Sequence, residues 1–220
     1  MTRKQRIEEV LKYLGSVRDD TETELDYTTP FELLIAVMLS AQCTDKRVNM
    51  VTPPLFAAYP TAADLANATA DEVFAYIKSV SYPNNKAKHL VAMAKMLQEM
   101  YAGQVPNTLE ELTALPGVGR KTANVVMAVA FGKAALAVDT HVYRVSHRLN
   151  LVPKDATTPY AVEKALRKYI PDATVAASHY WLLLHGRYTC TARNPKCDGC
   201  GLANLCPSKV KFVKTCSAKE

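Results

Sequence analysis

The segment Leu115-Pro116-Gly117-Val118-Gly119-Arg120-Lys121-Thr122-Ala123 decides how the rest of this chain is interpreted. Pro116 cannot continue a helix interior, and the two glycines can adopt positive φ without a Cβ penalty. A helix is expected to begin directly after Gly119, with its first amides pointing outward at the positive end of the helix dipole. The segment therefore predicts a cradle for an anion such as phosphate, although an ordinary turn between two helices would have the same pattern.

Arg120 and Lys121 place two cations in the first turn of this helix, where the dipole disfavours positive charge by about 0.3–1 kcal/mol. Such a departure from local preference is typical of functional sites. The helix end favours the neutral amine of Lys121, which is the form that attacks a carbon centre to make a Schiff base. A contact with phosphate or solvent is the alternative for both side chains, and for Arg120 we prefer it.

The pattern is helical nearly throughout. Thr29-Pro30-Phe31-Glu32 predicts an N-cap, a proline at the first helical position and a capping box, followed by an apolar run that predicts a buried central helix. Residues 134–138 could be a short strand or a loop. About ten helices and no sheet are expected, with helix ends at Gly15, Gly103, Gly132 and Gly186. The expected helices include residues 33–41, 73–80, 84–102, a short one from 108, 120–131, 140–149, 160–170 and 175–185.

Composition limits the class of protein. The chain has 220 residues, of which 49% are hydrophobic, so it can bury a sizeable core. No apolar run exceeds seven residues, whereas a membrane-spanning helix needs about 18. The charged start lacks the apolar core of a signal peptide. We therefore expect a soluble, cytoplasmic protein with no membrane partner.

Positive charge is concentrated near the C-terminus. The formal net charge is +6, and residues 187–214 hold six basic residues against a single acid, Asp198. This imbalance favours a nucleic-acid partner, with a solvated tail as the alternative. The basic residues are Arg187, Arg193, Lys196, Lys209, Lys211 and Lys214.

Four of the six cysteines lie within seventeen residues, at Cys190, Cys197, Cys200 and Cys206. Without a secretory signal, this spacing favours a four-thiolate metal site over disulfides. Structural zinc sites usually show two close pairs, and here there is one, so zinc fits poorly. The final Cys-Pro also occurs in ferredoxin-type sequences. Cys43 and Cys216 are isolated, and Cys43 is expected to be a small buried hydrophobe.

Four segments together resemble the endonuclease III family of helix-hairpin-helix DNA glycosylases. They are residues 115–123, residues 137–144, the central-helix end at 39–45, and residues 185–190, which lead into the cysteine spacing. The resemblance covers about residues 25–207 in the order of the family. It implies an all-α fold of two packed helical domains: a helical barrel domain with the hairpin at residues 22–134, and a helical iron–sulfur domain at residues 1–21 plus 135–220.

The resemblance also implies a bifunctional DNA glycosylase and AP lyase of base excision repair. Lys121 would attack the sugar C1′ to give a covalent imine, and Asp139 would stabilise the developing charge and move protons. β-Elimination of the 3′ phosphate would follow. An N-cap for the helix after it is an alternative or additional role for Asp139.

A [4Fe-4S] cluster on the four cysteines would hold the fold together and present basic residues to DNA. No acid occurs between Leu33 and Gln42, where adenine-removing relatives use a glutamate, so oxidised pyrimidines are the expected substrates. The competing hypothesis is a DNA-binding iron–sulfur sensor, which would have no use for Lys121 with Asp139.

Double-stranded DNA with damaged bases or abasic sites is the expected partner of a monomer associated with the nucleoid. Gln42 resembles the family residue that enters the gap left by a flipped base. Tyr82 takes the place of a leucine wedge, unless it only packs its loop. The other expected DNA-binding residues are Leu115, Gly117, Val118, Gly119, Arg120, His141, Arg144, Arg187, Arg193 and Lys196.

Overall fold

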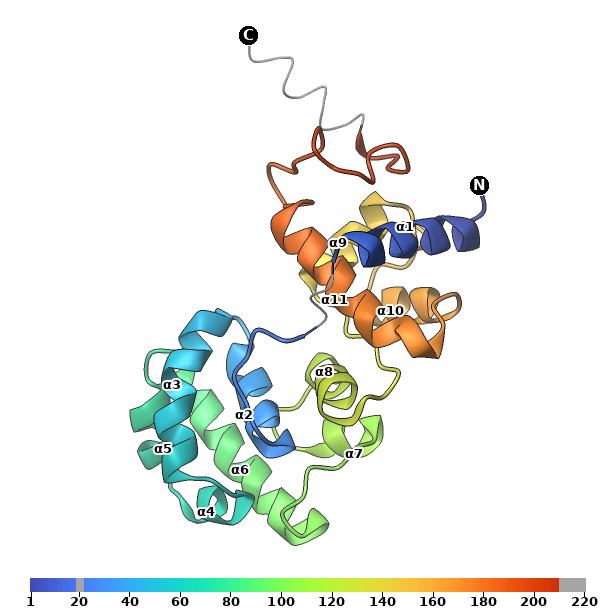
Figure 1. Ribbon diagram of the computed structural model, residues 1–220. Coiled ribbons are helices and arrows are strands. Elements are labelled where there is room, and N and C mark those ends of the chain that lie inside the picture. Colours follow the sequence, from blue (N-terminus) through green and yellow to red (C-terminus); the bar gives the residue numbers. More distant parts are fainter. Residues whose placement is uncertain (19–21, 210–220) are drawn as a thin grey trace. The chain divides into compact units, whose positions relative to one another are not determined.

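A computed structural model describes residues 1–18 and 22–209 (Figure 1). Within these residues the chain forms α-helices and no strand, which confirms the all-α prediction, and residues 134–138 form a loop. Lys211, Lys214 and Cys216 lie outside the described residues. The helices are α1 (Arg3–Val17), α2 (Pro30–Ser40), α3 (Asp45–Ala58), α4 (Ala62–Asn67), α5 (Ala70–Ile77), α6 (Pro83–Tyr101), α7 (Leu109–Ala114), α8 (Arg120–Phe131), α9 (Thr140–Arg148), α10 (Pro159–Arg167) and α11 (Asp172–Tyr188).

The chain divides into two compact units. One comprises Thr23–Lys133 and is called the hairpin unit here, because it contains the 115–123 segment. The other comprises Met1–Glu22 with Ala134–Glu220 and is called the cysteine unit. None of the helices in the described part of the chain combines the length and apolarity needed to cross a membrane.

Helix α2 forms the centre of the hairpin unit and packs against α3, α6 and α8 (Figure 1). Every residue from Leu33 to Leu39 is buried, as the apolar run predicts. Thr29 caps the helix and Pro30 occupies its first turn, as expected. Glu32 does not complete the expected capping box with Thr29, because its carboxylate instead accepts hydrogen bonds from the amide and hydroxyl of Thr28, at 2.6 and 2.7 Å.

The cysteine unit surrounds a second core. Helix α11 packs against both α1 and α9, and α9 also contacts α10. Helix α1 contributes an apolar stripe at Ile7, Val10, Leu11 and Leu14, which has the i, i+3, i+4, i+7 spacing of an amphipathic helix.

Two glycines expected to end helices lie inside them. Gly15 belongs to α1, where an added Cβ would lie 2.9 Å from the Trp181 ring. Gly186 belongs to α11, where an added Cβ would lie 2.8 Å from the Cβ of His141 on α9. Both therefore permit close helix approach. Gly103 and Gly132 do mark the ends of α6 and α8.

Candidate active site and cysteine cluster

The hairpin segment joins α7 to α8 through a tight turn. Gly117 has φ +77°, and an added Cβ would lie 2.8 Å from the Cβ of His89, so this position needs glycine for two reasons. The side chains of Leu115 and Val118 are buried and anchor the turn. Only their backbone groups could therefore face a ligand.

Gly119 precedes α8 and has a different environment. Gly119 is the N-cap of α8, and no side chain accepts a hydrogen bond from the first amides of this helix at the cap. The first turn of α8 contains no acidic residue either. An added Cβ at Gly119 would have nothing within 4 Å. A bulky anion can therefore approach the positive helix end from this side.

Lys121 and Arg120 occupy the first turn of α8, and both side chains are exposed. The Lys121 amine is thus accessible to an external electrophile. Its partner in the predicted chemistry, Asp139, belongs to the cysteine unit.

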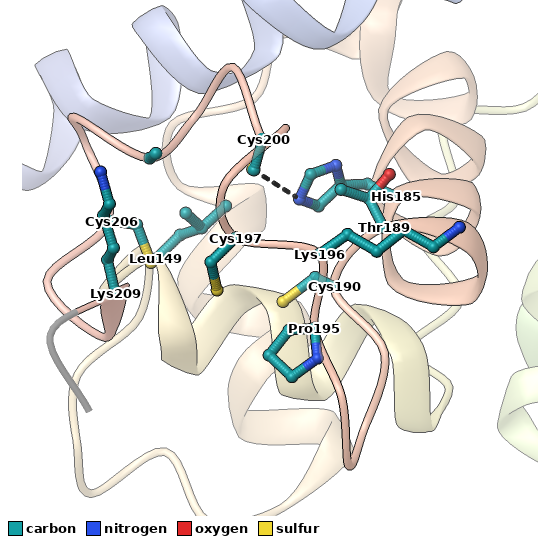
Figure 2. Close-up of a pocket in the computed structure, with 11 residues that line it drawn as sticks. Leu149, His185, Thr189, Cys190, Pro195, Lys196, Cys197, Cys200, Cys206 and Lys209 are labelled. Carbon is teal, nitrogen blue, oxygen red and sulfur yellow. Dashed lines mark hydrogen bonds between the residues drawn. The ribbon is translucent and has the colours of Figure 1, made fainter. Parts of the chain in front are cut away.

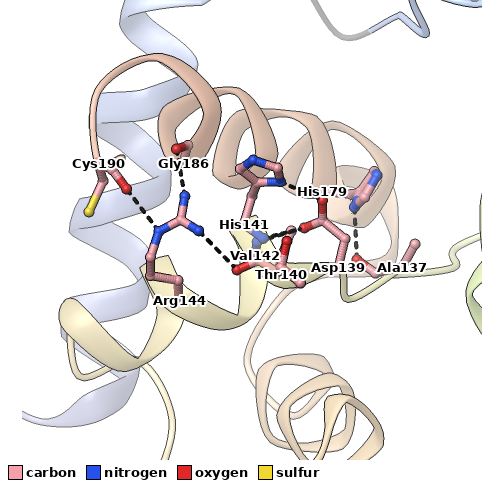
Figure 3. Close-up of polar contacts among 9 residues, drawn as sticks. All are labelled: Ala137, Asp139, Thr140, His141, Val142, Arg144, His179, Gly186 and Cys190. Atoms are coloured by element: carbon pink, nitrogen blue, oxygen red, sulfur yellow. Dashed lines mark hydrogen bonds and ion pairs between the residues drawn. The ribbon is translucent and has the colours of Figure 1, made fainter. Parts of the chain in front are cut away.

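Asp139 is the N-cap of α9 (Figure 3). One carboxylate oxygen accepts hydrogen bonds from the amides of His141 at 2.9 Å and Val142 at 2.8 Å. The other lies 2.8 Å from Nδ1 of His141. Burial raises the pKa of Asp139, but the hydrogen bonds from Val142 and His141 and the nearby His141 charge outweigh this effect and lower the pKa. The carboxylate is therefore ionised and fixed in orientation.

The neighbouring helix α11 holds this site in position. Nδ1 of His179 donates to the carbonyl of Ala137 at 2.8 Å, just before Asp139. Gly186 allows the backbone of α11 to approach His141 closely. The loop and the first turn of α9 are thus packed against one side of α11 (Figure 3).

Arg144 is one of the expected DNA-binding residues, and in this structure its guanidinium is directed at protein carbonyl groups. It donates to Cys190 at 3.0 Å, to Gly186 at 2.7 Å and to Thr140 at 3.4 Å (Figure 3). These bonds connect α9 to the end of α11 and to the first cysteine. In this arrangement Arg144 acts as a structural connection.

The four clustered cysteines line one hollow, together with residues that include Leu149, His185 and Lys209 (Figure 2). All four are free and partly buried. In the described part of the chain, no three His, Cys, Asp or Glu side chains are grouped so as to hold one metal ion. Thiols spread around a hollow suit a polynuclear cluster better than a single zinc ion.

The electrostatics of the hollow also fit a cluster. Burial raises the pKa of Cys197 and of Cys200, and the neighbouring thiols raise both further. Four thiolates in one hollow repel each other unless a cationic core lies between them. The residues present therefore fit an iron–sulfur cluster.

Sequence reasoning missed two residues beside these cysteines. Arg148, at the end of α9, donates to the carbonyls of Thr191 at 2.6 Å and Ala192 at 2.8 Å, and lies 3.4 Å from Sγ of Cys190. Nε2 of His185 lies 3.9 Å from Sγ of Cys200. Burial and the positive charge of Arg18 lower the pKa of His185 to about 4, so it is neutral at pH 7. No local pattern in the sequence indicates this role of Arg148, because its hydrogen-bond partners lie 43 and 44 positions away.

The remaining residues predicted to contact DNA are found in both units. In the cysteine unit, Arg193 and Lys196 are exposed on the loop between the first two cysteines, and Arg187 is half-buried on α11. In the hairpin unit, Gln42 and Tyr82 are both exposed. Their loops are joined, because the Ser81 hydroxyl donates to the Gln42 carbonyl at 2.6 Å.

Comparison with known proteins identifies the family. Residues 35–172 match the model of the HhH-GPD superfamily base excision DNA repair proteins, and residues 190–206 match the iron–sulfur binding domain of endonuclease III. The chain is 47% identical to endonuclease III of Synechocystis sp., with 94% of each chain covered. It is 43% identical to endonuclease III of Escherichia coli K12, covering 96% of this chain and 99% of that protein.

Solved structures agree with this assignment. The structure of a trapped endonuclease III–DNA covalent intermediate in an estranged-adenine complex matches with a TM-score of 0.92 and 45% identity, covering 97% of this chain and 100% of that chain. The hairpin, the capped aspartate and the cysteine hollow are thus found in a chain that belongs to the endonuclease III family of base excision DNA repair proteins.

Proposed function

We propose that this protein is a bifunctional DNA glycosylase and AP lyase that uses Lys121 as its nucleophile and Asp139 as its proton-transferring carboxylate. The observation that carries the proposal is the exposed amine of Lys121 at the N-terminus of α8. An accessible lysine beside a phosphate-binding helix end can reach the sugar of a bound nucleotide. A glycosylase that only removes bases would not need this amine.

Two steps are assigned to Lys121. Its neutral amine forms a bond to C1′ as the N-glycosidic bond breaks, and the base leaves with a proton. Loss of the amine proton and ring opening give an imine, which acidifies the C2′ hydrogen. Removal of that hydrogen expels the 3′ phosphate and cuts the strand, and hydrolysis of the imine then frees Lys121.

Asp139 supports the first step as an ionised carboxylate. The pKa of its carboxyl group is lowered by the hydrogen bonds from Val142 and His141, so it carries the negative charge that stabilises a developing positive charge on the sugar. Its other role is to accept and return protons. Both roles are compatible with the N-cap, because capping fixes the direction of the carboxylate.

DNA binding is assigned to two regions. In the hairpin unit, the α8 N-terminus would hold a phosphate through backbone amides, while Gln42 and Tyr82 would enter the duplex beside the flipped nucleotide. In the cysteine unit, Arg193 and Lys196 would contact the backbone. The substrates are oxidised pyrimidines and abasic sites in double-stranded DNA, and the protein acts as a monomer on the nucleoid.

Cys190, Cys197, Cys200 and Cys206 would hold a [4Fe-4S] cluster. When bound, the cluster supplies a cationic core that cross-links the four thiolates. The chain's own contribution is to shape the loop: the carbonyls of residues 190–192 accept hydrogen bonds from Arg144 and Arg148. These bonds fix the loop that presents Arg193 and Lys196.

Borohydride trapping on DNA with an abasic site tests the proposal. Borohydride reduces the imine and leaves protein and DNA covalently joined. Lys121→Ala should abolish the trapped complex while DNA binding persists. Lys95→Ala, which removes an exposed lysine of α6, is the matched control and should trap normally. Normal trapping by Lys121→Ala would remove Lys121 as the nucleophile, and no trapping by the unaltered protein would favour a DNA-binding sensor.

A further inference from the structure

We propose that Ser81 and Lys86 are positioning residues that join the loops of Gln42 and Tyr82 into one preformed, two-pronged element. The inference rests on the proposed function, in which Gln42 and Tyr82 enter the duplex. It assigns two residues that touch neither the base nor the sugar. All four residues belong to the hairpin unit.

The first observation is the backbone of Gln42. Ala41 has φ −57° and ψ 113°, Gln42 has φ 56°, and the amide of Cys43 donates to the carbonyl of Ser40 at 3.0 Å. These values describe a type II turn over residues 40–43. Its second central position favours glycine or asparagine, yet a long exposed glutamine occupies it.

Tyr82 has a second unusual backbone. It is the N-cap of α6 with φ 54° and ψ 49°, and it makes no side-chain cap. An N-cap is normally extended and occupied by a short polar residue. A left-handed tyrosine is disfavoured and persists only where the surrounding structure determines it. The side chain is nevertheless 62% exposed, so burial of the ring does not explain the conformation.

Lys86 ties the first loop to α6. Its side chain extends inward, so the residue is only 9% exposed. The ammonium donates to the carbonyls of Leu39 and Ala41, at 2.7 Å each. These carbonyls are at the C-terminal end of α2, where they lack helical partners and attract cations. Lys86 thus fixes the residues immediately before Gln42.

Ser81 ties the second loop to the first. Its hydroxyl donates to the carbonyl of Gln42 at 2.6 Å. The amide of Lys86 donates to the carbonyl of Tyr82 at 3.2 Å. Gln42 and Tyr82 are therefore held from both sides by a closed set of bonds. A prepositioned pair loses less conformational freedom when it enters DNA.

The experiment compares two single-turnover rates for each variant: base excision from a lesion duplex, and strand cleavage at an abasic site in single-stranded DNA. Only the duplex reaction requires the prongs. Ser81→Ala and Lys86→Gln should each lower the ratio of duplex to single-strand rates by about fivefold, as expected for a lost hydrogen bond. Ser79→Ala and Lys95→Gln, at exposed positions in the same loop and helix, are the matched controls and should leave the ratio unchanged.

A combined variant separates positioning from general stability. In a Gln42→Ala/Tyr82→Ala background the prongs are absent, so adding Ser81→Ala should produce no further loss. If Ser81→Ala lowers the ratio of duplex to single-strand rates as much in this background as in the unaltered protein, the proposal is overturned. Ser81 is at the surface, and its variant keeps the test valid if Lys86→Gln fails to fold.

The outcomes distinguish this proposal from the proposed function. If Gln42→Ala and Tyr82→Ala slow duplex excision but Ser81→Ala does not, the positioning role of Ser81 is wrong. The insertion of Gln42 and Tyr82 into the duplex is then still supported. If neither prong variant slows duplex excision, both the prongs and their positioning fail. Borohydride trapping by Lys121 is measured separately and decides the lyase assignment in either case.

Discussion

The carboxylate of Asp139 lies 2.8 Å from Nδ1 of His141 and also accepts the amide hydrogen bonds that begin α9. One side chain thus starts a helix and holds a fixed negative charge. The same bonds that build the fold lower the pKa of the carboxyl group. Stability and chemistry are therefore coupled at this residue.

This coupling predicts a pH-dependent cost for Asp139→Asn. Because folding lowers the pKa of Asp139, its ionised form stabilises the protein above the unfolded pKa, and this contribution is lost as pH falls through the lower folded pKa. Asparagine keeps the cap but not the charge, so the variant should be about 1 kcal/mol less stable at pH 7, with the gap closing below about pH 4. Urea unfolding across this range measures it. Asp71 is an exposed carboxylate in α5, so Asp71→Asn should lower the free energy of unfolding at pH 7 by less than Asp139→Asn does. An equal loss for the two variants would contradict the prediction.

The two hairpin glycines should respond differently to alanine. Gly117→Ala forces a left-handed alanine with its Cβ 2.8 Å from His89, so it should destabilise the protein by about 1–3 kcal/mol. Gly119→Ala meets open space and should cost less than about 1 kcal/mol. Its methyl group lies where a phosphate would approach, so it should weaken binding to damaged and undamaged duplex alike. Melting temperatures and binding isotherms check both effects, and a stable Gly117→Ala would contradict the clash.

Removing Arg148 should loosen the cysteine loop. The unaltered protein should contain iron and inorganic sulfide in equal amounts, and zinc without sulfide would contradict the cluster. Arg148→Ala loses the bonds to Thr191 and Ala192 and the contact with Cys190, so iron should be released to a chelator several-fold faster. Arg167→Ala, which removes a surface ion pair with Asp172, is the control. Equal release rates would show that Arg148 does not hold the loop.

Lys196 should contribute a phosphate contact. It is exposed on the loop between the first two cysteines, and neutralising one phosphate changes the slope of log K against log salt by about 0.9. Lys196→Ala should flatten the slope by this amount, measured by titration of duplex DNA at several salt concentrations. Lys95→Ala serves as the comparison. An unchanged slope for Lys196→Ala would show that this side chain makes no phosphate contact and is solvated instead.

Local chemistry allowed much of the fold to be predicted. Thr69 and Glu72 form a capping box at the start of α5, which has the same Thr-x-x-Glu spacing as residues 29–32. Gly132 ends α8 in the left-handed conformation expected of a helix C-cap. These signals depend on residues a few positions apart, so the sequence contains all the information they need. The cysteine spacing and the hairpin segment are local in the same sense. The helix expected to begin at residue 175 begins earlier, at Asp172, directly after its N-cap Pro171.

Tertiary structure alone decided the features that depend on distant partners. Gly15 and Gly186 are glycines because Trp181 and His141 leave no room for a Cβ. Arg144 and Arg148 donate to carbonyl groups more than 40 positions away, and nothing near either arginine in the sequence indicates these partners. The bond from Ser81 to Gln42 likewise spans 39 positions. A hydrogen bond or a steric limit exists only when both partners are in place, so the fold must form before such a role is defined.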